Sequence, residues 1–155
     1  MNIIISSIII FMKRDRRITL LDDFDHFVDD EHENNNFSDL CSSIMNNKEK
    51  AYFILNDKNK IICVSKKWEQ ICGYTQEEIY HEGFNKLQGP ETDKNIINKF
   101  MDDIKKFKKS TMNIINYTKT NDRIKIKVDA IKHDFNFDNI FPINRPEYIA
   151  EIKII

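Results

Sequence analysis

Cysteine and histidine are the side chains of this sequence with the most varied chemistry, because their sulfur and nitrogen atoms bind metals, carry protons and act as nucleophiles. The three cysteines, Cys41, Cys63 and Cys72, form no C-x-x-C pair, and their odd number argues against a framework of disulfides. Such cysteine use is typical of a reducing compartment. His26 and His32 lie among carboxylates, but no ligand spacing repeats there, so we interpret the stretch as a hydrated acidic surface instead of a metal site.

Motifs for enzyme catalysis are also missing from the sequence. It contains no glycine-rich phosphate loop, no H-E-x-x-H pair, no nucleophile elbow and no paired carboxylates within a motif. His81 and His133 fall in expected loops, where a solvated histidine is the commoner case, and a heme-ligand role has no motif behind it. The sequence therefore predicts no catalytic residues and no metal site, and we expect a protein that is not an enzyme.

The composition predicts one globular domain without a membrane span or a nucleic-acid surface. At 155 residues and 18.5 kDa the chain has room for a single module, and 41% hydrophobic residues provide a core. A charged fraction of 32% and a mean hydropathy of -0.54 exclude an integral membrane protein, and the apolar run 3–11 is far shorter than the roughly 20 residues that a span needs. The formal charge of -1 provides no positive field for nucleic acid. We expect a cytoplasmic protein.

Residues 1–36 are expected to form a flexible N-terminal extension. The stretch 21–36 is rich in aspartate and glutamate and ends in three asparagines, which is typical of a solvated linker. Because the first residues match neither a signal peptide nor the rest of the chain, we expect Met12 to be the true start. A short cap helix is predicted over residues 37–47. Its apolar residues at helical spacing are Phe37, Leu40, Cys41 and Ile44.

A β-hairpin and then helices are predicted after the cap helix. Two apolar runs flank an N-D-K-N turn and predict the hairpin over residues 51–64. Of two short helices that follow, the first ends at Gly73 and the second opens with a capping box of Thr75 and Glu78. The first carries on one face Trp68, Ile71 and Cys72. A longer helix starts after residues 90–93 and is expected to pack on a sheet. Its apolar stripe contains Ile96, Ile97, Phe100, Ile104 and Phe107.

Three strands are predicted in the C-terminal half, at residues 111–118, 123–131 and 148–154, joined by a turn at 119–122 and a loop at 134–147. The side chains expected to face the core are Ile124, Ile126, Val128, Ala130, Tyr148, Ala150, Ile152 and Ile154. The order β-β-α-α-β-β-β indicates an α+β fold. We expect a five-stranded antiparallel sheet with helices packed on one face and a pocket between the helices and the sheet.

Three strings of residues resemble the PAS superfamily and, within it, the light-oxygen-voltage (LOV) domains, which bind flavin mononucleotide (FMN). The string W-E-Q-I-C-G-Y-T-Q-E-E at 68–78 is similar to the family's F-x-x-x-T-G-Y-S-x-E-E. The string L-Q-G-P-E-T-D at 87–93 matches the sequence that ends the family's N-C-R-F-L-Q-G signature, and the third string is I-N-Y-T-K at 115–119. The resemblance covers residues 51–155 in order. It implies a PAS-like fold and a PAS/LOV-like domain over residues 37–155.

The resemblance also implies that the light chemistry of LOV domains is lost. That chemistry needs a cysteine beside the flavin, whose sulfur adds to a ring carbon in light, and Phe84 occupies its position. Two arginines clamp the flavin phosphate in the family, and they correspond here to Asn85 and Met101. Cys63 and Cys72 lie on other predicted elements, so we interpret them as small buried hydrophobic residues and not as substitute thiols.

Most residues that would bind the polar edge of the flavin ring are replaced as well. The family uses two asparagines and one glutamine there, and only Asn116 remains, since Ile126 and Ile152 occupy the other two positions. Gln88 of the second string is retained too. If flavin is bound, the resemblance implies that Gln88 and Asn116 bind it. If no flavin is bound, we interpret both side chains as hydrogen-bonding to backbone groups. We expect no cofactor, with FMN as the alternative.

Two functions remain open from the sequence. The first is a PAS/LOV-like sensory or protein-interaction module without cysteinyl-flavin photochemistry, whose pocket is apolar or filled by its own side chains. The alternative is a flavin-binding (FMN or FAD) blue-light or redox sensor that works without the cysteine adduct, with Trp68 or a nearby tyrosine as electron donor. The expected partner is another protein or a second copy in a homodimer. Because the chain ends at Ile155, directly after its last predicted strand, we expect any signal to pass to such a partner.

Overall fold

The elements of the chain follow the predicted order. The computed structural model of the protein describes residues 37–132 and 146–155. Its elements are α2 (Phe37–Asn46), β1 (Ala51–Asn56), β2 (Ile61–Val64), α3 (Lys66–Cys72), α4 (Gln76–Ile79), the 3-10 helix η3 (Phe84–Leu87), α5 (Lys94–Phe107), β3 (Lys109–Tyr117), β4 (Arg123–Lys132) and β5 (Pro146–Ile154). The predicted extension 1–36 and residues 134–145 of the predicted loop lie outside the described residues.

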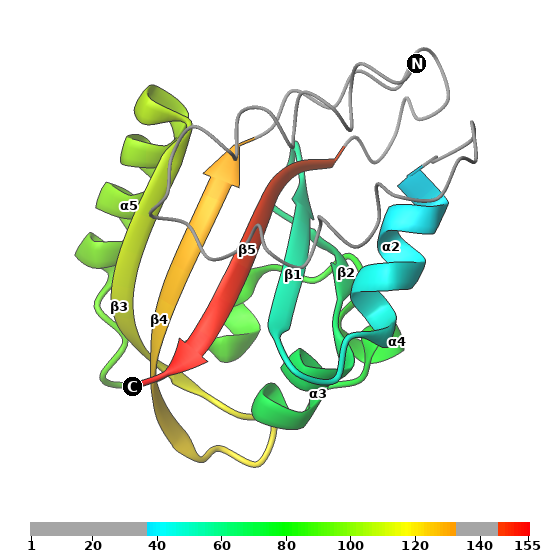
Figure 1. The fold of residues 1–155 in the computed structure, drawn as a ribbon. Helices are drawn as coiled ribbons and strands as arrows, with labels where there is room; N and C mark the ends of the chain where they lie inside the picture. Colours follow the sequence, from blue (N-terminus) through cyan, green and yellow to red (C-terminus); the bar gives the residue numbers. More distant parts are fainter. Residues whose placement is uncertain (1–36, 133–145) are drawn as a thin grey trace.

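The five strands form one antiparallel sheet in the order β2-β1-β5-β4-β3, so the first and last strands lie side by side in the middle (Figure 1). Helices α3, α4 and α5 lie behind the sheet in this view, and the core lies between them and the sheet. This arrangement confirms the predicted α+β class and the five-stranded antiparallel sheet. The cap helix α2 does not lie with these helices, because it packs on β2 at the opposite face of the sheet. Cys63 of β2 belongs to this opposite face and not to the main core cluster.

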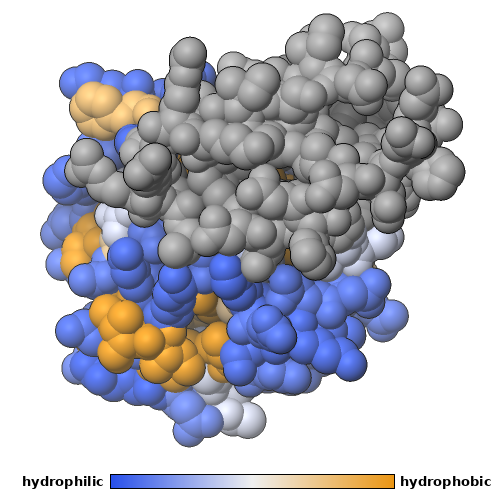
Figure 2. All heavy atoms as spheres, in the orientation of Figure 1, coloured by the Kyte–Doolittle hydropathy of each residue, from blue (hydrophilic) through white to orange (hydrophobic). Residues whose placement is uncertain are grey.

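Alternation along the strands places most of the predicted core residues on the inner face. The residues buried in the core cluster are Ile126, Val128 and Ala130 of β4 and Tyr148, Ala150 and Ile152 of β5. Ile124 of β4 is half-buried and packs against this cluster. Ile154 was expected to continue this row, and this was wrong because it is 60% exposed. Figure 2 shows a group of hydrophobic atoms on the surface in the region where β5 ends. The pairing between β1 and β5 ends at Ala51 and Ile152, so Ile154 extends past the part of the sheet that the core covers.

The apolar stripe of α5 is narrower than predicted. Phe100 and Ile104 are buried and Ile97 is half-buried, whereas Ile96 is 37% exposed and Phe107 is 57% exposed. Residues three, four and seven positions apart share one helical face, and Ile97 with Phe100, Met101 and Ile104 fits that spacing. Phe107 lies in the last turn, directly before the left-handed C-cap Lys108 that leads the chain into β3.

Capping interactions fix the short helices close to the predicted residues. Ser65 is the N-cap of α3 and its side chain accepts a hydrogen bond from the Trp68 N–H, while Gly73 ends the helix with φ of 82°, a left-handed conformation that suits glycine. The predicted capping box of Thr75 and Glu78 is confirmed at α4. Within residues 37–132 and 146–155, no helix is both long enough and apolar enough to cross a membrane.

Candidate functional site

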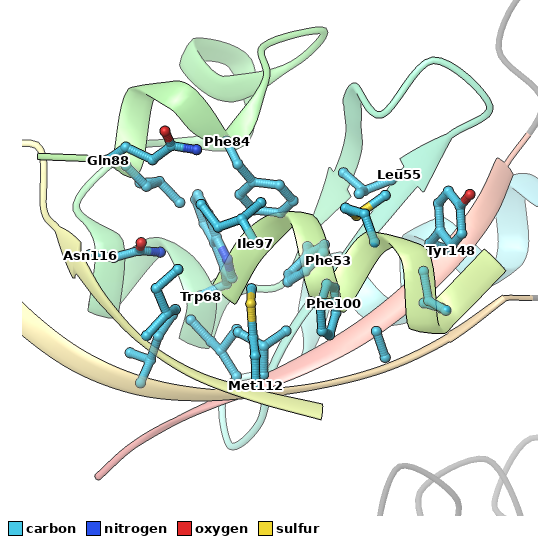
Figure 3. A pocket seen from close by; sticks show the side chains of 18 residues that line it. Phe53, Leu55, Trp68, Phe84, Gln88, Ile97, Phe100, Met112, Asn116 and Tyr148 are labelled. Atoms are coloured by element: carbon cyan, nitrogen blue, oxygen red, sulfur yellow. The ribbon is translucent and has the colours of Figure 1, made fainter. Parts of the chain in front are cut away.

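A pocket lies between the inner face of the sheet and the helices, as the sequence predicted. Apolar side chains from β1, α3, η3, α5 and the three C-terminal strands line it (Figure 3). Its cavity volume is about 50 Å³. For comparison, an apolar cavity of about 150 Å³ binds one benzene molecule, and a water molecule needs about 10–15 Å³. The cavity therefore has room for a few water molecules at most and not for a ring system.

The ring of Phe84 takes up part of this space. Phe84 is the first residue of η3, and its ring meets that of Phe53 edge to face, with centroids 4.7 Å apart and an interplanar angle of 69° (Figure 3). This is a favoured geometry for an aromatic pair. The residue that the resemblance equates with the photoactive cysteine therefore packs across the pocket onto the central strand β1.

Gln88 and Asn116, the two predicted cofactor ligands, are brought together at one end of the pocket (Figure 3). Gln88 follows η3 as its C-cap residue, and Asn116 lies on β3 opposite Ile124 of β4. Asn116 is only 7% exposed. Both side chains end in an amide that can donate and accept hydrogen bonds, so this end of the pocket is able to bind polar atoms.

Trp68, which the sequence suggested only as an electron donor to a bound flavin, adds a third polar group. Its side chain is 0% exposed and lines the pocket, and among the described residues its Nε1–H is the buried side-chain polar atom that lacks a hydrogen-bond partner. The inward helical face of α3 was the signal in the sequence. An unpaired indole N–H costs about 1–3 kcal/mol, which a water molecule or another acceptor in the cavity would offset.

The other positions implied by the resemblance are apolar or point away from the pocket. Ile126, Ile152 and Met101 line the pocket, whereas Asn85 is exposed and does not line it. No lysine or arginine occurs among the lining residues that the structure describes, so no cation is present there to bind a phosphate. Tyr148 also lines the pocket, and burial, followed by the charge of Glu147, raises its pKa so that its hydroxyl stays protonated.

The cysteines contribute no thiol to the pocket. Neither Cys63 nor Cys72 is among its lining residues. Cys72 is packed in the core cluster, and burial raises the pKa of its thiol to about 12, so it agrees with the predicted role of a small hydrophobic residue. The described residues also contain no group of three histidine, cysteine, aspartate or glutamate side chains that could hold a metal ion.

Comparisons with known proteins agree with this architecture. No protein-family model matches the sequence. Phototropin-2 and phototropin-1A of Oryza sativa subsp. japonica are each 38% identical to the chain over 72 residues, which is 44% of this chain. The matched segment spans only 8% of the length of either phototropin.

Solved structures match over more of the chain. The PAS domain of the fruit-fly ELK potassium channel has a TM-score of 0.63 at 17% identity, covering 78% of this chain and 98% of that domain. The LOV domain of the blue-light activated histidine kinase of Erythrobacter litoralis has a TM-score of 0.59 at 15% identity, covering 69% and 96%. The light-state LOV domain of the blue-light photoreceptor Aureochrome1 has a TM-score of 0.58 at 19% identity, covering 77% and 88%.

The fold of this chain is therefore the PAS fold. LOV domains are among the solved structures similar to this chain, and phototropins are among the similar sequences.

Proposed function

We propose that the domain is a sensory or protein-interaction module that works without cysteinyl-flavin photochemistry and whose pocket is filled by its own side chains. The observation that carries this proposal is the cavity volume of about 50 Å³ in a pocket crossed by the Phe84 ring. A phenylalanine has no thiol to add to a flavin, and Cys63 and Cys72 do not line the pocket.

The chemistry of the lining also disfavours the usual cofactor of LOV domains. A flavin ring presents carbonyl and N–H groups along its edge, and each such group buried without a partner costs about 1–3 kcal/mol. Ile126 and Ile152 offer no hydrogen bond at two of the positions implied by the resemblance. Each 1.4 kcal/mol is a tenfold loss of affinity, so these two replacements together predict a loss of about 30- to 20,000-fold.

Absorbance spectroscopy tests this proposal directly. The chain is purified from cells supplied with excess riboflavin, incubated with FMN and passed through a desalting column, with the Erythrobacter litoralis LOV domain as the positive control. We expect a colourless protein without the visible absorption of a bound flavin. A coloured protein with stoichiometric flavin would overturn the proposal.

Trp68 provides a second measurement on the same sample. It is the one tryptophan of the sequence and it lines the pocket, so a flavin bound there would quench its fluorescence by energy transfer. We expect FMN to leave the Trp68 emission unchanged after correction for absorbance. A saturable decrease in emission would place flavin in the pocket.

A flavin-binding blue-light or redox sensor without the cysteine adduct is the second candidate. The observation in its favour is that the polar groups of Gln88, Asn116 and Trp68 line one cavity, where the Trp68 Nε1–H has no hydrogen-bond partner. If flavin does bind, replacing both amides (Q88L/N116L) should weaken its binding, and Trp68→Phe should slow photoreduction if the indole is the electron donor. Flavin binding that both amide replacements leave unchanged would remove this role for Gln88 and Asn116.

The domain boundaries and the partner follow from the same proposal. We place the PAS/LOV-like domain at residues 37–155, with α2 as its cap helix and residues 1–36 as an extension, in a non-enzymatic cytoplasmic protein. Its partner would be another protein or a second copy, not nucleic acid or a membrane, in line with the net charge of -1. Limited proteolysis should trim the chain to a stable fragment starting near Phe37, and a stable fragment that begins well beyond α2 would contradict these boundaries. Sedimentation should reveal a dimer, and a strict monomer would contradict the homodimer.

A further inference from the structure

Two thiols meet where helix α2 packs on strand β2, on the face of the sheet opposite the pocket. Cys63 is buried on β2 next to Ile54 of β1, and Cys41 lies half-buried on α2. The Cys63 Sγ donates a hydrogen bond to the backbone carbonyl oxygen of Cys41 at 3.5 Å. Figure 1 shows α2 running along this edge of the sheet.

The Cys41 side chain also acts on the Cys63 thiol. A hydrogen bond with the Cys41 side chain is the largest cause that raises the pKa of Cys63 far above its usual range, followed by burial and by the charge that a Cys41 thiolate would carry. The Cys63 thiol is therefore protonated and adjacent to Cys41. The third cysteine, Cys72, belongs to the core cluster on the inner side of the sheet and is not part of this pair.

Because one thiol is accessible and its neighbour is buried, their roles in an oxidation differ. An oxidant in solution can reach half-buried Cys41, whereas Cys63 is shielded. A sulfenic acid formed at Cys41 would have the Cys63 sulfur beside it as the resolving thiol, and this pairing is typical of redox-sensitive cysteines.

We propose that Cys41 and Cys63 form an intrachain disulfide when the protein meets a peroxide, and that this modification fastens α2 to β2. In the first step the Cys41 sulfur attacks hydrogen peroxide, which gives Cys41–SOH and water and reduces the peroxide by two electrons. In the second step the Cys63 thiol gives up its proton as its sulfur attacks the Cys41 sulfur, the S–S bond forms, and the S–O bond of Cys41 breaks so that its hydroxyl leaves with that proton as a second water molecule. A thiol reductant reverses the modification by exchange.

The disulfide would change how firmly the cap helix is attached. Besides the sulfur contact, α2 is held by the buried Ile44 and by a 3.0 Å hydrogen bond from the Lys67 N–H to the Asn47 carbonyl oxygen at its C-terminal end. A covalent link between α2 and β2 closes a loop in the unfolded chain and lowers its entropy. Oxidation should therefore raise the unfolding temperature and slow hydrogen exchange in α2.

Peptide mapping after peroxide treatment tests the proposal on the full chain. Trypsin places the three cysteines in separate peptides, 18–48, 61–66 and 68–86. We expect the oxidised protein to lose two hydrogen atoms of mass, to keep one free thiol of its three, and to yield peptide 18–48 joined to 61–66. Dithiothreitol should restore all three thiols.

Matched variants assign the bond. Cys72→Ser should still form the link, whereas Cys41→Ser and Cys63→Ser should both lose it. Because Cys41 is only half-buried, Cys41→Ser should fold normally and provides the test if Cys63→Ser does not fold. Three outcomes overturn the proposal: a Cys41 sulfinic acid with Cys63 still free, a link that includes Cys72, or a disulfide only between two chains on a non-reducing gel.

Discussion

Replacing Phe84 with alanine tests whether its ring is what keeps the pocket closed. Removing the ring adds about 100 Å³ of empty space to the cavity of about 50 Å³, if the surrounding side chains do not collapse into it. The sum is close to the cavity of about 150 Å³ that binds benzene in a protein core. The variant should therefore gain a binding site for a small aromatic molecule that the parent chain lacks.

The same change should destabilise the protein by a predictable amount. Cavity creation costs about 24 cal/mol per Å³, which gives about 2.4 kcal/mol for the space left by the ring. The edge-to-face contact with Phe53 adds about 0.5–1.5 kcal/mol, and partial collapse and the half-buried position of Phe84 reduce the total. We expect a loss of about 2–3 kcal/mol. Benzene at ten times its Kd should then restore about 1.4 kcal/mol.

Urea unfolding followed by Trp68 fluorescence measures both effects, since this side chain is buried at the pocket. Phe107→Ala is the matched control because Phe107 is 57% exposed, so its removal should cost about 0.5 kcal/mol or less and benzene should not help it. The reasoning fails if benzene stabilises the parent chain as much as the variant, because the pocket would then be open already. It also fails if Phe84→Ala is no less stable than Phe107→Ala.

Three further predictions concern stability. Ser65→Ala should cost about 2–4 kcal/mol in urea unfolding, because this fully buried hydroxyl accepts from two backbone N–H groups and donates to a backbone carbonyl; a loss below 1 kcal/mol would contradict it. Gly89→Ala should cost about 1–3 kcal/mol, since its added Cβ would overlap the Tyr117 ring, and unchanged stability would show that the ring moves freely. Lys119 and the capping interactions at α4 hold the pKa of the Glu78 carboxyl below its usual 4.5. The ionised carboxylate therefore stabilises the folded protein fully above pH 4.5, and this contribution is lost as the pH falls through the lower pKa of the folded state. Glu78→Gln should therefore flatten the acid side of a stability profile, and an unaltered profile would count against the contact.

Local patterns in the sequence predicted the elements because each pattern depends on neighbouring residues. The alternation in β4 and the capping box at Thr75 need no knowledge of distant parts of the chain. Ile154 and Ile96 were placed wrongly because burial depends on what lies opposite, and a periodic pattern does not show where the sheet or the helix stops being covered. The same limit left the side of the sheet that α2 occupies undetermined.

The position of the pocket was predictable from the sequence, whereas the size of its cavity was not. Gln88 and Asn116 were named from the sequence, and the structure brings them to one end of the pocket. The volume of the cavity could not be predicted, because it is a small difference between the space within the fold and the space that side chains fill. The unpaired Nε1–H of Trp68 and the contact between Cys41 and Cys63 also required coordinates, since each depends on residues brought together by folding.

The place of β5 between β1 and β4 has a consequence for how the chain folds. Tyr117 and Arg123, which pair across β3 and β4, are only about six positions apart in sequence, whereas Ala51 pairs with Ile152 roughly 100 residues away. Closing the longer loop costs about 2.5 kcal/mol more in chain entropy. Both hairpins can therefore form early, and the sheet is completed only when the last strand inserts between them. Until then β1 and β4 each present an open edge, so slow synthesis or misplacement of this one nine-residue strand would expose the protein to aggregation.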